Sequence, residues 1–422
     1  MRIDIRPLLV LLLAAGAWAC TEDLDGSAAC PALCPDQGIP VREIELTGVA
    51  VDTTITQYPT RGTEGLIPLI TAGDSLDTRA VVRFDTVTRV ITPTATGSTA
   101  LPIETIDSVF VRLGLEDTLA VRPASVIIEV FDVDTTAADT NFAAVASLFR
   151  SDRLLGADTL TAAEAQDSVR IFLDATKVLD RVRAAGRVRL GVRATGEGGA
   201  AVFLRVKTLV TGTAASLFYR ARADTAVRLL AHAPESRTPD EEAVRVDLVD
   251  YALYVRGTRP PGPDEIVVGG LPGRRAYLRF DVPLWLTDST TVVRASLVLT
   301  QRGRGAGFAF DTLSIAPHLV VAGADVRDVA RAASLIASAS SLGVDSLLVA
   351  PEDSVARIFE IGPVLRFWAN RPTSELPRAV VLRTPYEGGF PREARFFSLE
   401  APAAVRPRLL VVYIPREPFG IP

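Results

Sequence analysis

The chain has 422 residues, of which 48% are hydrophobic and 23% charged, and its formal net charge is −5. This length suits two domains better than a single core, and the apolar content excludes an intrinsically disordered chain. Nucleic-acid binding needs clustered Lys and Arg, so the near balance of charge excludes a generic polyanion binder.

The first 19 residues have the pattern of a signal peptide. A basic start precedes an apolar stretch over 7–17, which is too short to span a bilayer because a spanning helix needs about 20 residues. Ala17 and Ala19 fit the small-x-small pattern of signal cleavage. Because Cys20 follows directly, the segment also resembles a bacterial lipobox, although Trp18 departs from it. Lipidation of Cys20 is the favoured prediction, and plain secretion is the alternative.

An exported protein held by a lipid on Cys20 would lie at the outer membrane or the cell surface, with the membrane as its partner. Residues 20–40 are then a lipidated tether. Cys30 and Cys34 lie within it, and an oxidising compartment favours a local disulfide between them. The alternative, a zinc site, needs four ligands, and neither histidine of the chain is near. We therefore expect no metal site here.

The rest of the chain contains an internal duplication. The segment RAVVRFD at 79–85 recurs as RAYLRFD at 275–281. Further on, SVRIF at 168–172 recurs as SVARIF at 354–359. A repeat of this kind predicts two similar domains in tandem.

The domain boundaries predicted from the duplication are 41–222 and 223–416. Since each repeat should carry a complete core, we expect residues 223–416 to fold alone.

Alternation of apolar and polar residues predicts antiparallel strands in both repeats. Phe84 and Phe280 share one face of their segments with small apolar residues, so both are expected in a core. Arg83 and Arg279 fall on the opposite face, where truncation should cost much less. Further strands are predicted at 188–192, 201–207, 292–300, 313–321, 378–382 and 408–414.

Helix signals are few. Asp174 is a good N-cap for a helix that ends at Gly186, and residues 362–370 form its counterpart in the second repeat. A third helix is predicted over 325–341. The fold class predicted is all-β: two tandem jelly-roll-like antiparallel β-sandwiches, each with one short helix.

The second repeat resembles a known family. Its motifs follow in the order YLRFD, VRASLVL, VLRFW, FSLE and RPRLLVVY, and they extend over most of 243–414. They are similar to the DNRLRE-type domain, a jelly-roll β-sandwich related to carbohydrate-binding modules and found in bacterial surface proteins. The first repeat keeps only the RFD strand and the short helix of this pattern. The resemblance implies a surface or polysaccharide-associated module.

No catalytic constellation is found in the sequence. His232 and His318 occupy non-equivalent positions of the two repeats and are interpreted as structural. No nucleophile elbow, zinc-protease helix or P-loop motif occurs. Asp132 and Asp134 are too few to hold a calcium ion, so a solvated turn is expected there. The sequence therefore predicts a protein that is not an enzyme and has no cofactor.

Sugar-binding surfaces use exposed aromatic rings, which makes four residues candidate glycan contacts: Tyr251, Tyr254, Tyr386 and Phe390. The competing interpretation for all four is core packing or loop anchoring. Trp285 and Trp368 are expected to be core anchors.

Three functional hypotheses follow. The favoured one is a non-catalytic envelope lipoprotein whose sandwiches bind polysaccharide or an envelope protein. The second is a purely structural envelope lipoprotein without a small ligand. The third, a polysaccharide-active enzyme, has the least support in the sequence.

Overall fold

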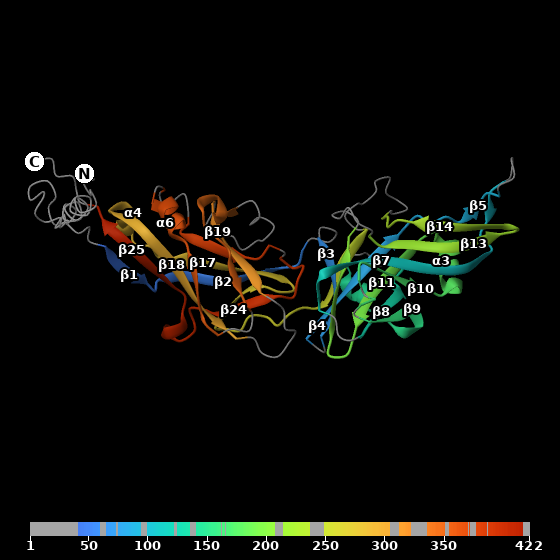
Figure 1. Cartoon of the computed structure of the whole chain (residues 1–422), viewed down its shortest axis with the longest axis horizontal. Helices are drawn as coiled ribbons and strands as arrows, with labels where there is room; N and C mark the ends of the chain where they lie inside the picture. Colours follow the sequence, from blue (N-terminus) through green and yellow to red (C-terminus); the bar gives the residue numbers. More distant parts are fainter. Residues whose placement is uncertain are drawn as a thin grey trace, which may run out of the picture.

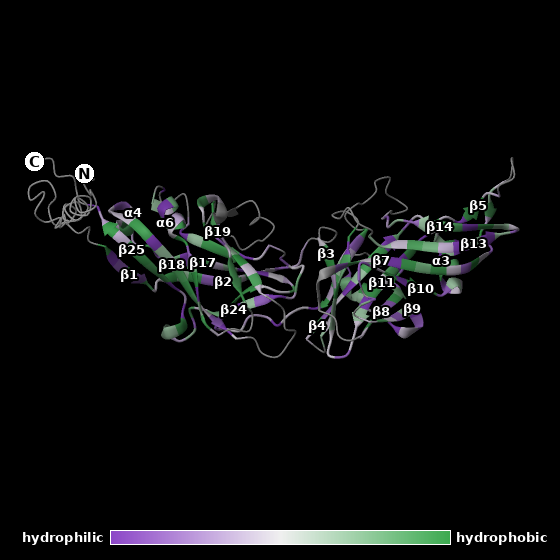
Figure 2. Cartoon of the chain, in the orientation of Figure 1, coloured by the Kyte–Doolittle hydropathy of each residue, from purple (hydrophilic) through white to green (hydrophobic). Residues whose placement is uncertain are grey.

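The computed structural model describes residues 41–59, 65–72, 75–93, 99–121, 125–135, 141–161, 163–164, 166–206, 214–236, 249–303, 312–321, 336–350, 354–369, 371, 377–385 and 387–416. Cys20, Cys30, Cys34 and Tyr386 lie outside these ranges. Antiparallel strands dominate, and they form two lobes arranged along the long axis of the molecule (Figure 1). The all-β fold predicted from the sequence is confirmed. Apolar and polar residues alternate along many strands (Figure 2).

One lobe, which we call the inserted domain, is built from residues 66–256. Hydrogen bonds join eleven of its strands into one continuous sheet that folds over into two layers. Its strands are β3 (Leu66–Ala72), β4 (Leu76–Phe84), β5 (Val90–Ile91), β6 (Leu101–Pro102), β7 (Thr105–Val121), β8 (Ser125–Asp132), β9 (Leu154–Thr161), β10 (Ser168–Phe172), β11 (Val188–Thr195), β12 (Ala200–Arg205), β13 (Ser216–Ala223), β14 (Ala226–His232) and β15 (Asp250–Arg256).

The other lobe, the split domain, combines residues 42–57 with residues 265–415. Two six-stranded sheets enclose its core. Its strands are β1 (Arg42–Leu46), β2 (Val49–Gln57), β16 (Glu265–Gly269), β17 (Gly273–Phe280), β18 (Thr290–Arg302), β19 (Leu313–Val320), β20 (Ile336–Ser338), β21 (Leu347–Val349), β22 (Ala356–Glu360), β23 (Ala379–Arg383), β24 (Glu393–Phe397) and β25 (Arg408–Pro415).

The two repeats exchange their first two strands. In the inserted domain, β14 pairs with β13 and β15 pairs with β4. In the split domain, β1 pairs with β25 and β2 pairs with β17. Thus β1 and β2 occupy the places in the split domain that β14 and β15 occupy in the inserted domain.

The strand exchange contradicts the domain boundaries that were predicted from the duplication. The boundary at 222/223 falls at the β13–β14 hairpin, where the second sequence repeat begins. The folded bodies do not follow it, because β1 and β2 pair with strands of the second body, and β14 and β15 pair with strands of the first. Domains at 41–222 and 223–416 therefore do not describe the structure.

The helices are short. They are α2 (Phe142–Ala146), α3 (Ala175–Ala185), α4 (Leu284–Asp288) and α6 (Gly362–Ala369), with 3-10 turns η1 (Ser151–Arg153), η3 (Ala339–Leu342) and η4 (Ala403–Val405). The predicted helices α3 and α6 are confirmed. Asp174 caps α3 by accepting two amide hydrogen bonds, and Gly186 ends it with a φ of 63°. Within the described residues, the short helices α2 and α4 are further elements that the sequence pattern did not predict.

The helix predicted over 325–341 is not seen in its described part. Residues 336–338 form β20, and η3 follows directly. The rest of that predicted helix lies outside the described residues.

The two phenylalanines of the RFD segments lie in equivalent cores, as predicted. Phe84 is 0% exposed in the inserted domain, and Phe280 is 4% exposed in the split domain. Phe280 packs near Trp368, whose ring centroid is 6.3 Å away. The prediction that both arginines tolerate truncation does not fit the structure, because Arg83 is only 1% exposed and forms an ion pair with Asp85 at 2.5 Å.

Candidate functional site

The aromatic residues predicted to contact sugar do not form one exposed surface. Tyr251 is 1% exposed and lies in an apolar cluster with Val81, Phe131 and Phe149 on the outer face of the β4 layer. The helix α2 contributes Val145 to the same cluster. Tyr251 is therefore a packing residue, which was the competing interpretation.

Tyr254 and Phe390 meet at the junction of the two domains. The hydroxyl of Tyr254 donates a 2.9 Å hydrogen bond to the carbonyl oxygen of Gly388. The ring of Phe390 is 9% exposed and packs against Phe203 of the inserted domain, with 4.9 Å between centroids. These side chains connect the two domains. Phe390 therefore exposes no ring face that could bind a sugar. Tyr386 lies outside the described residues.

A row of three phenylalanines lies instead on the outer face of the β10–β7–β13 layer. Phe110 on β7 pairs in register with Phe172 on β10 and with Phe218 on β13. Because residues in register on neighbouring strands point to the same face, the three rings form one line across the sheet. We call these three residues the aromatic row.

The rings of the aromatic row contact one another. Phe110 and Phe218 are stacked, with 4.9 Å between centroids and 14° between planes. Phe172 is tilted by 57° from Phe110 at 5.8 Å. Phe172 is also the most open of the three, with 67% of its surface exposed. An exposed group of large apolar side chains on a sheet face is a common mark of a binding surface.

Polar side chains border the aromatic row on both sides. Arg170 and Arg112 are paired in register on one side, and their guanidinium carbons lie 5.7 Å from the Phe110 centroid and 5.5 Å from the Phe218 centroid. The Nε of Arg112 is buried without a hydrogen-bond partner. On the other side, Ser108 pairs in register with Arg220. The face thus offers apolar rings together with hydrogen-bond donors.

The split domain provides an internal comparison for this face. The amide of Leu173 donates to the carbonyl of Val109, and the amide of Ile361 donates to the carbonyl of Ala295, so these two strand pairs are equivalent. By this equivalence the aromatic row corresponds to Glu360, Ser296 and Leu410. The same fold is therefore built without aromatic rings at these positions.

The sequence repeat does not reveal the aromatic row, because SVRIF and SVARIF align Phe172 with Phe359. In the structure, Phe359 is 2% exposed and is equivalent to the buried Ile171. The signal was present in the alternation itself: in SVRIF, Phe172 falls on the polar face with Ser168 and Arg170. A large aromatic residue on the polar face of a strand needs a reason other than the core.

The two histidines lie in different domains and make structural contacts. His232 Nε2 lies 3.0 Å from the hydroxyl of Tyr219, and their rings stack. His318 Nδ1 lies 3.2 Å from the carbonyl oxygen of Ala316. Burial lowers the pKa of both histidines, which favours the neutral imidazole.

Asp132 and Asp134 are not in a solvated turn as expected, because arginines pair with both. Arg153 and Arg181 contact Asp132 at 3.1 and 2.6 Å, and Arg187 contacts Asp134 at 2.9 Å. Within the described residues, no group of three or more His, Cys, Asp or Glu side chains is placed to hold a metal ion.

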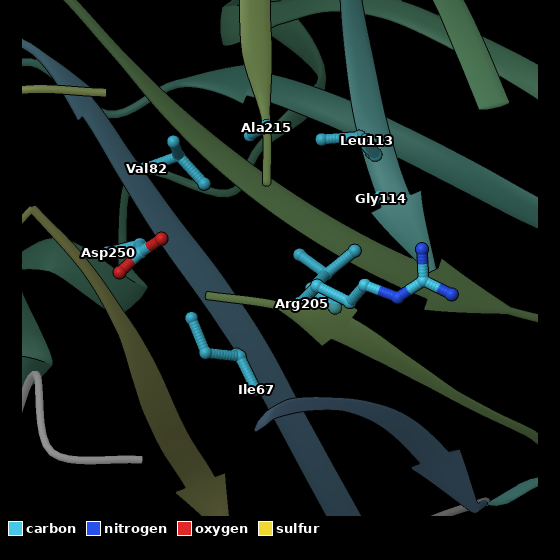
Figure 3. Close-up of a pocket in the computed structure, with 8 residues that line it drawn as sticks. Ile67, Val82, Leu113, Gly114, Arg205, Ala215 and Asp250 are labelled. Carbon is cyan, nitrogen blue, oxygen red and sulfur yellow. The ribbon is translucent and has the colours of Figure 1, made fainter. Parts of the chain in front are cut away.

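A gap lies between the layers of the inserted domain (Figure 3). Val82, Leu113 and Asp250 are among its lining residues. Arg205 also lines it, but its guanidinium points away and donates to Asp167 at 2.7 Å. The gap is too narrow to hold a water molecule, so it is a seam in the packing and not a ligand pocket.

Comparisons with known proteins do not assign a family. No family model matches the chain, and no characterised protein matches its sequence. Among solved structures, the C-terminal domain of the antigen I/II-family protein AspA of Streptococcus pyogenes aligns over 84% of this chain and 92% of its own, with 8% identity and a TM-score of 0.15. The tandem CBM22 domains of Xyn10C from Paenibacillus barcinonensis align over 89% and 100%, with 11% identity and a TM-score of 0.14. Similarity this low supports no conclusion about the ligand.

Among the described residues, no helix is long and apolar enough to cross a membrane.

Proposed function

We propose that this chain is a non-catalytic, lipid-anchored envelope protein whose inserted domain binds a polysaccharide on the aromatic row. The observation that carries the proposal is the register of Phe172, Phe110 and Phe218 on an exposed sheet face. The equivalent positions of the split domain hold Glu360, Ser296 and Leu410, so the fold itself does not require the rings.

The chemistry of the face suits a sugar chain. The C–H face of a pyranose ring packs against an aromatic ring, and Phe172 is the ring most open to such contact. Hydroxyl groups of the sugar need donors and acceptors beside that ring. Arg170 on β10 and Arg112 and Ser108 on β7 lie beside the aromatic row and supply these hydrogen-bonding groups. The DNRLRE-like order of motifs lies in the second repeat, so it supports a polysaccharide-associated protein as a whole and not the aromatic row in particular.

Binding of polysaccharides by the chain from residue 21 to 422 tests this proposal. A panel of immobilised bacterial envelope and plant cell-wall polysaccharides should retain the wild type. Phe172→Ala should reduce retention about tenfold or more, because aromatic contacts at a binding surface contribute on the order of 1–2 kcal/mol or more.

The matched control is Ile358→Ala. Ile358 is 48% exposed on β22, the strand of the split domain that is equivalent to β10, so its truncation should leave retention unchanged. Equal loss in both variants would reject the aromatic row as the site. Failure of every polysaccharide to bind would favour the structural lipoprotein instead.

The anchor is tested at Cys20. Metabolic labelling with a fatty-acid analogue should mark the wild type and leave Cys20→Ser unmarked, because the thiol is the acylated group. Acyl chains contribute about 0.8 kcal/mol per buried CH₂, so the wild type should also stay with the membrane fraction. Equal membrane association of both forms would reject the lipid anchor.

A further inference from the structure

The split domain carries a group of exposed apolar side chains at the end where its first and last strands meet. We call this group the apolar end; it consists of Val41, Leu284, Trp285 and Val293. Their exposed fractions are 60%, 59%, 42% and 49%. Isolated exposed apolar residues need no explanation, but a group of them does.

These residues come from three segments that converge on Tyr413. The ring of Trp285 on α4 makes an edge contact with the ring of Tyr413 at 5.4 Å. Tyr413 pairs in register with Arg42, the residue after Val41, and with Val292, the residue before Val293. Val41 and Val293 alternate to the sheet face opposite Tyr413, whereas Trp285 contacts Tyr413 from the core side, so the apolar end is a rim around this end of the split domain and not one flat face. It lies where β1, β25 and α4 lie together in Figure 1.

The two exposed apolar residues of α4 are not needed to hold this helix against the core. Leu286 of this helix is 0% exposed and supplies its contact with the core. Leu284 and Trp285 precede it and face outward. The sequence-based expectation that Trp285 is a core anchor is wrong, whereas Trp368 is buried completely as expected.

The chain itself indicates what covers this surface. Val41 is the first described residue, and it belongs to the apolar end. The acylated residue of the proposed anchor, Cys20, lies 21 positions earlier in the chain, so even a fully extended segment reaches at most about 75 Å. A lipid on Cys20 would therefore tether the protein to the bilayer through the end of the molecule where Val41 lies, and the inserted domain lies at the other end (Figure 1).

The polar surroundings fit the boundary of a bilayer. Tryptophan and tyrosine favour this boundary because their rings are apolar and their polar atoms remain hydrated. Arginine side chains also occur there, with the charged group directed to water. Arg366 donates to the carbonyl oxygens of Val292 and Val293, and Arg294 pairs with Glu360. Charges of both signs are present, so the attraction is mainly apolar.

We infer that the apolar end is a membrane-contact surface that inserts into the lipid interface. The inference rests on the lipid anchor of the proposed function, and it adds a second contact that fixes how the protein stands on the membrane. With this end in the interface, the split domain lies next to the bilayer. The aromatic row of the inserted domain is then held away from it.

Tryptophan fluorescence tests the inference. The chain from residue 21 to 422 lacks Cys20 and Trp18 but retains every described strand, since these lie between 42 and 415. Its two tryptophans are the buried Trp368 and the exposed Trp285. Phosphatidylcholine vesicles should shift the emission to shorter wavelength, because Trp285 leaves water, and the protein should sediment with the vesicles.

Leu284→Asp should weaken vesicle binding about fivefold or more, because a charge replaces an apolar side chain at the interface. Leu229→Asp is the matched control: Leu229 is 67% exposed in the inserted domain, so binding should not change. The melting temperatures of both variants check that they fold. An emission spectrum unchanged by vesicles, or equal weakening in both variants, would overturn the inference.

This experiment separates the inference from the anchor on which it rests. The tested chain carries no acyl group, so its vesicle binding reports the apolar end alone. Failure of acyl labelling at Cys20 would instead reject the lipid anchor without changing the vesicle result.

Discussion

Leu46 on β1 lies directly across from Leu409 on β25, so the two ends of the described chain are paired in one sheet. Both side chains are buried in the core of the split domain. The described part of the chain begins in this domain, continues through the inserted domain, and then returns to complete the split domain. The stability of the split domain therefore depends on contacts between residues that are far apart from one another in the sequence.

The first prediction concerns fragments. Residues 65–256 contain all strands of the inserted domain, so this fragment should fold alone and melt cooperatively. Residues 223–416 lack β1 and β2, and they carry β14 and β15 without their partners β13 and β4. We expect this second fragment to melt broadly or to aggregate, because it has unpaired strand edges. Circular dichroism during thermal unfolding measures both fragments.

Cooperative melting of residues 223–416 at the temperature of the whole chain would contradict this prediction. It would mean that β14 and β15 can take the places of β1 and β2.

The strand exchange explains which parts of the fold the sequence can predict. Local signals suffice for the RFD strands, for α3 with its cap at Asp174, and for the duplication. They do not decide whether β2 or β15 pairs with β17, because the two segments have equivalent roles in similar repeats. Phe172 is predictable from its position on a polar face, whereas Phe218, which stacks on Phe110, can be placed only from the register of β13 with β7.

The second prediction concerns the two equivalent cores. Phe84→Ala and Phe280→Ala should each reduce the free energy of unfolding by about 3–5 kcal/mol, because both rings are buried and each truncation leaves a cavity. This is a large part of the ~5–15 kcal/mol that stabilises a typical domain. Phe84→Ala should affect the inserted domain, and Phe280→Ala the split domain. Denaturation followed by probes placed in each domain measures the two transitions. A loss below about 1 kcal/mol at either site would show that the cores are not equivalent.

The third prediction separates two arginines that look alike in the sequence. Arg83 and Arg279 occupy equivalent positions, but Arg83 is 1% exposed and contacts Asp85, which also pairs with Arg189 at 2.8 Å. Removing one member of a buried ion pair costs up to about 3–5 kcal/mol when the remaining charge is left uncompensated. Arg189 still contacts Asp85 after truncation of Arg83, so part of this cost is offset.

Arg83→Ala should therefore destabilise the inserted domain strongly. Arg279 is partly exposed, so Arg279→Ala should cost about 1 kcal/mol or less. Urea denaturation of both variants measures the difference. Similar losses at the two positions would show that burial of the Arg83 pair does not contribute to stability.

The last prediction concerns acid. Burial alone would raise the pKa of Glu265, but the amide of Gly262 and the guanidinium groups of Arg259 and Arg395 donate to its carboxylate and lower the pKa to about 2. A carboxylate with a lowered pKa in the folded state stabilises the fold above its ordinary pKa of 4.5, and this contribution is lost as the pH falls from 4.5 toward 2. The free energy of unfolding of the split domain should fall across that window.

Glu265→Gln should lower the stability at pH 7 and flatten the dependence of the free energy of unfolding on pH between pH 4.5 and pH 2. Glu360→Gln is the control, because its ion pair with Arg294 is about half exposed and should contribute little. If Glu265→Gln and the wild type lost stability in parallel from pH 4.5 to pH 2, the carboxylate of Glu265 would not be the group that titrates.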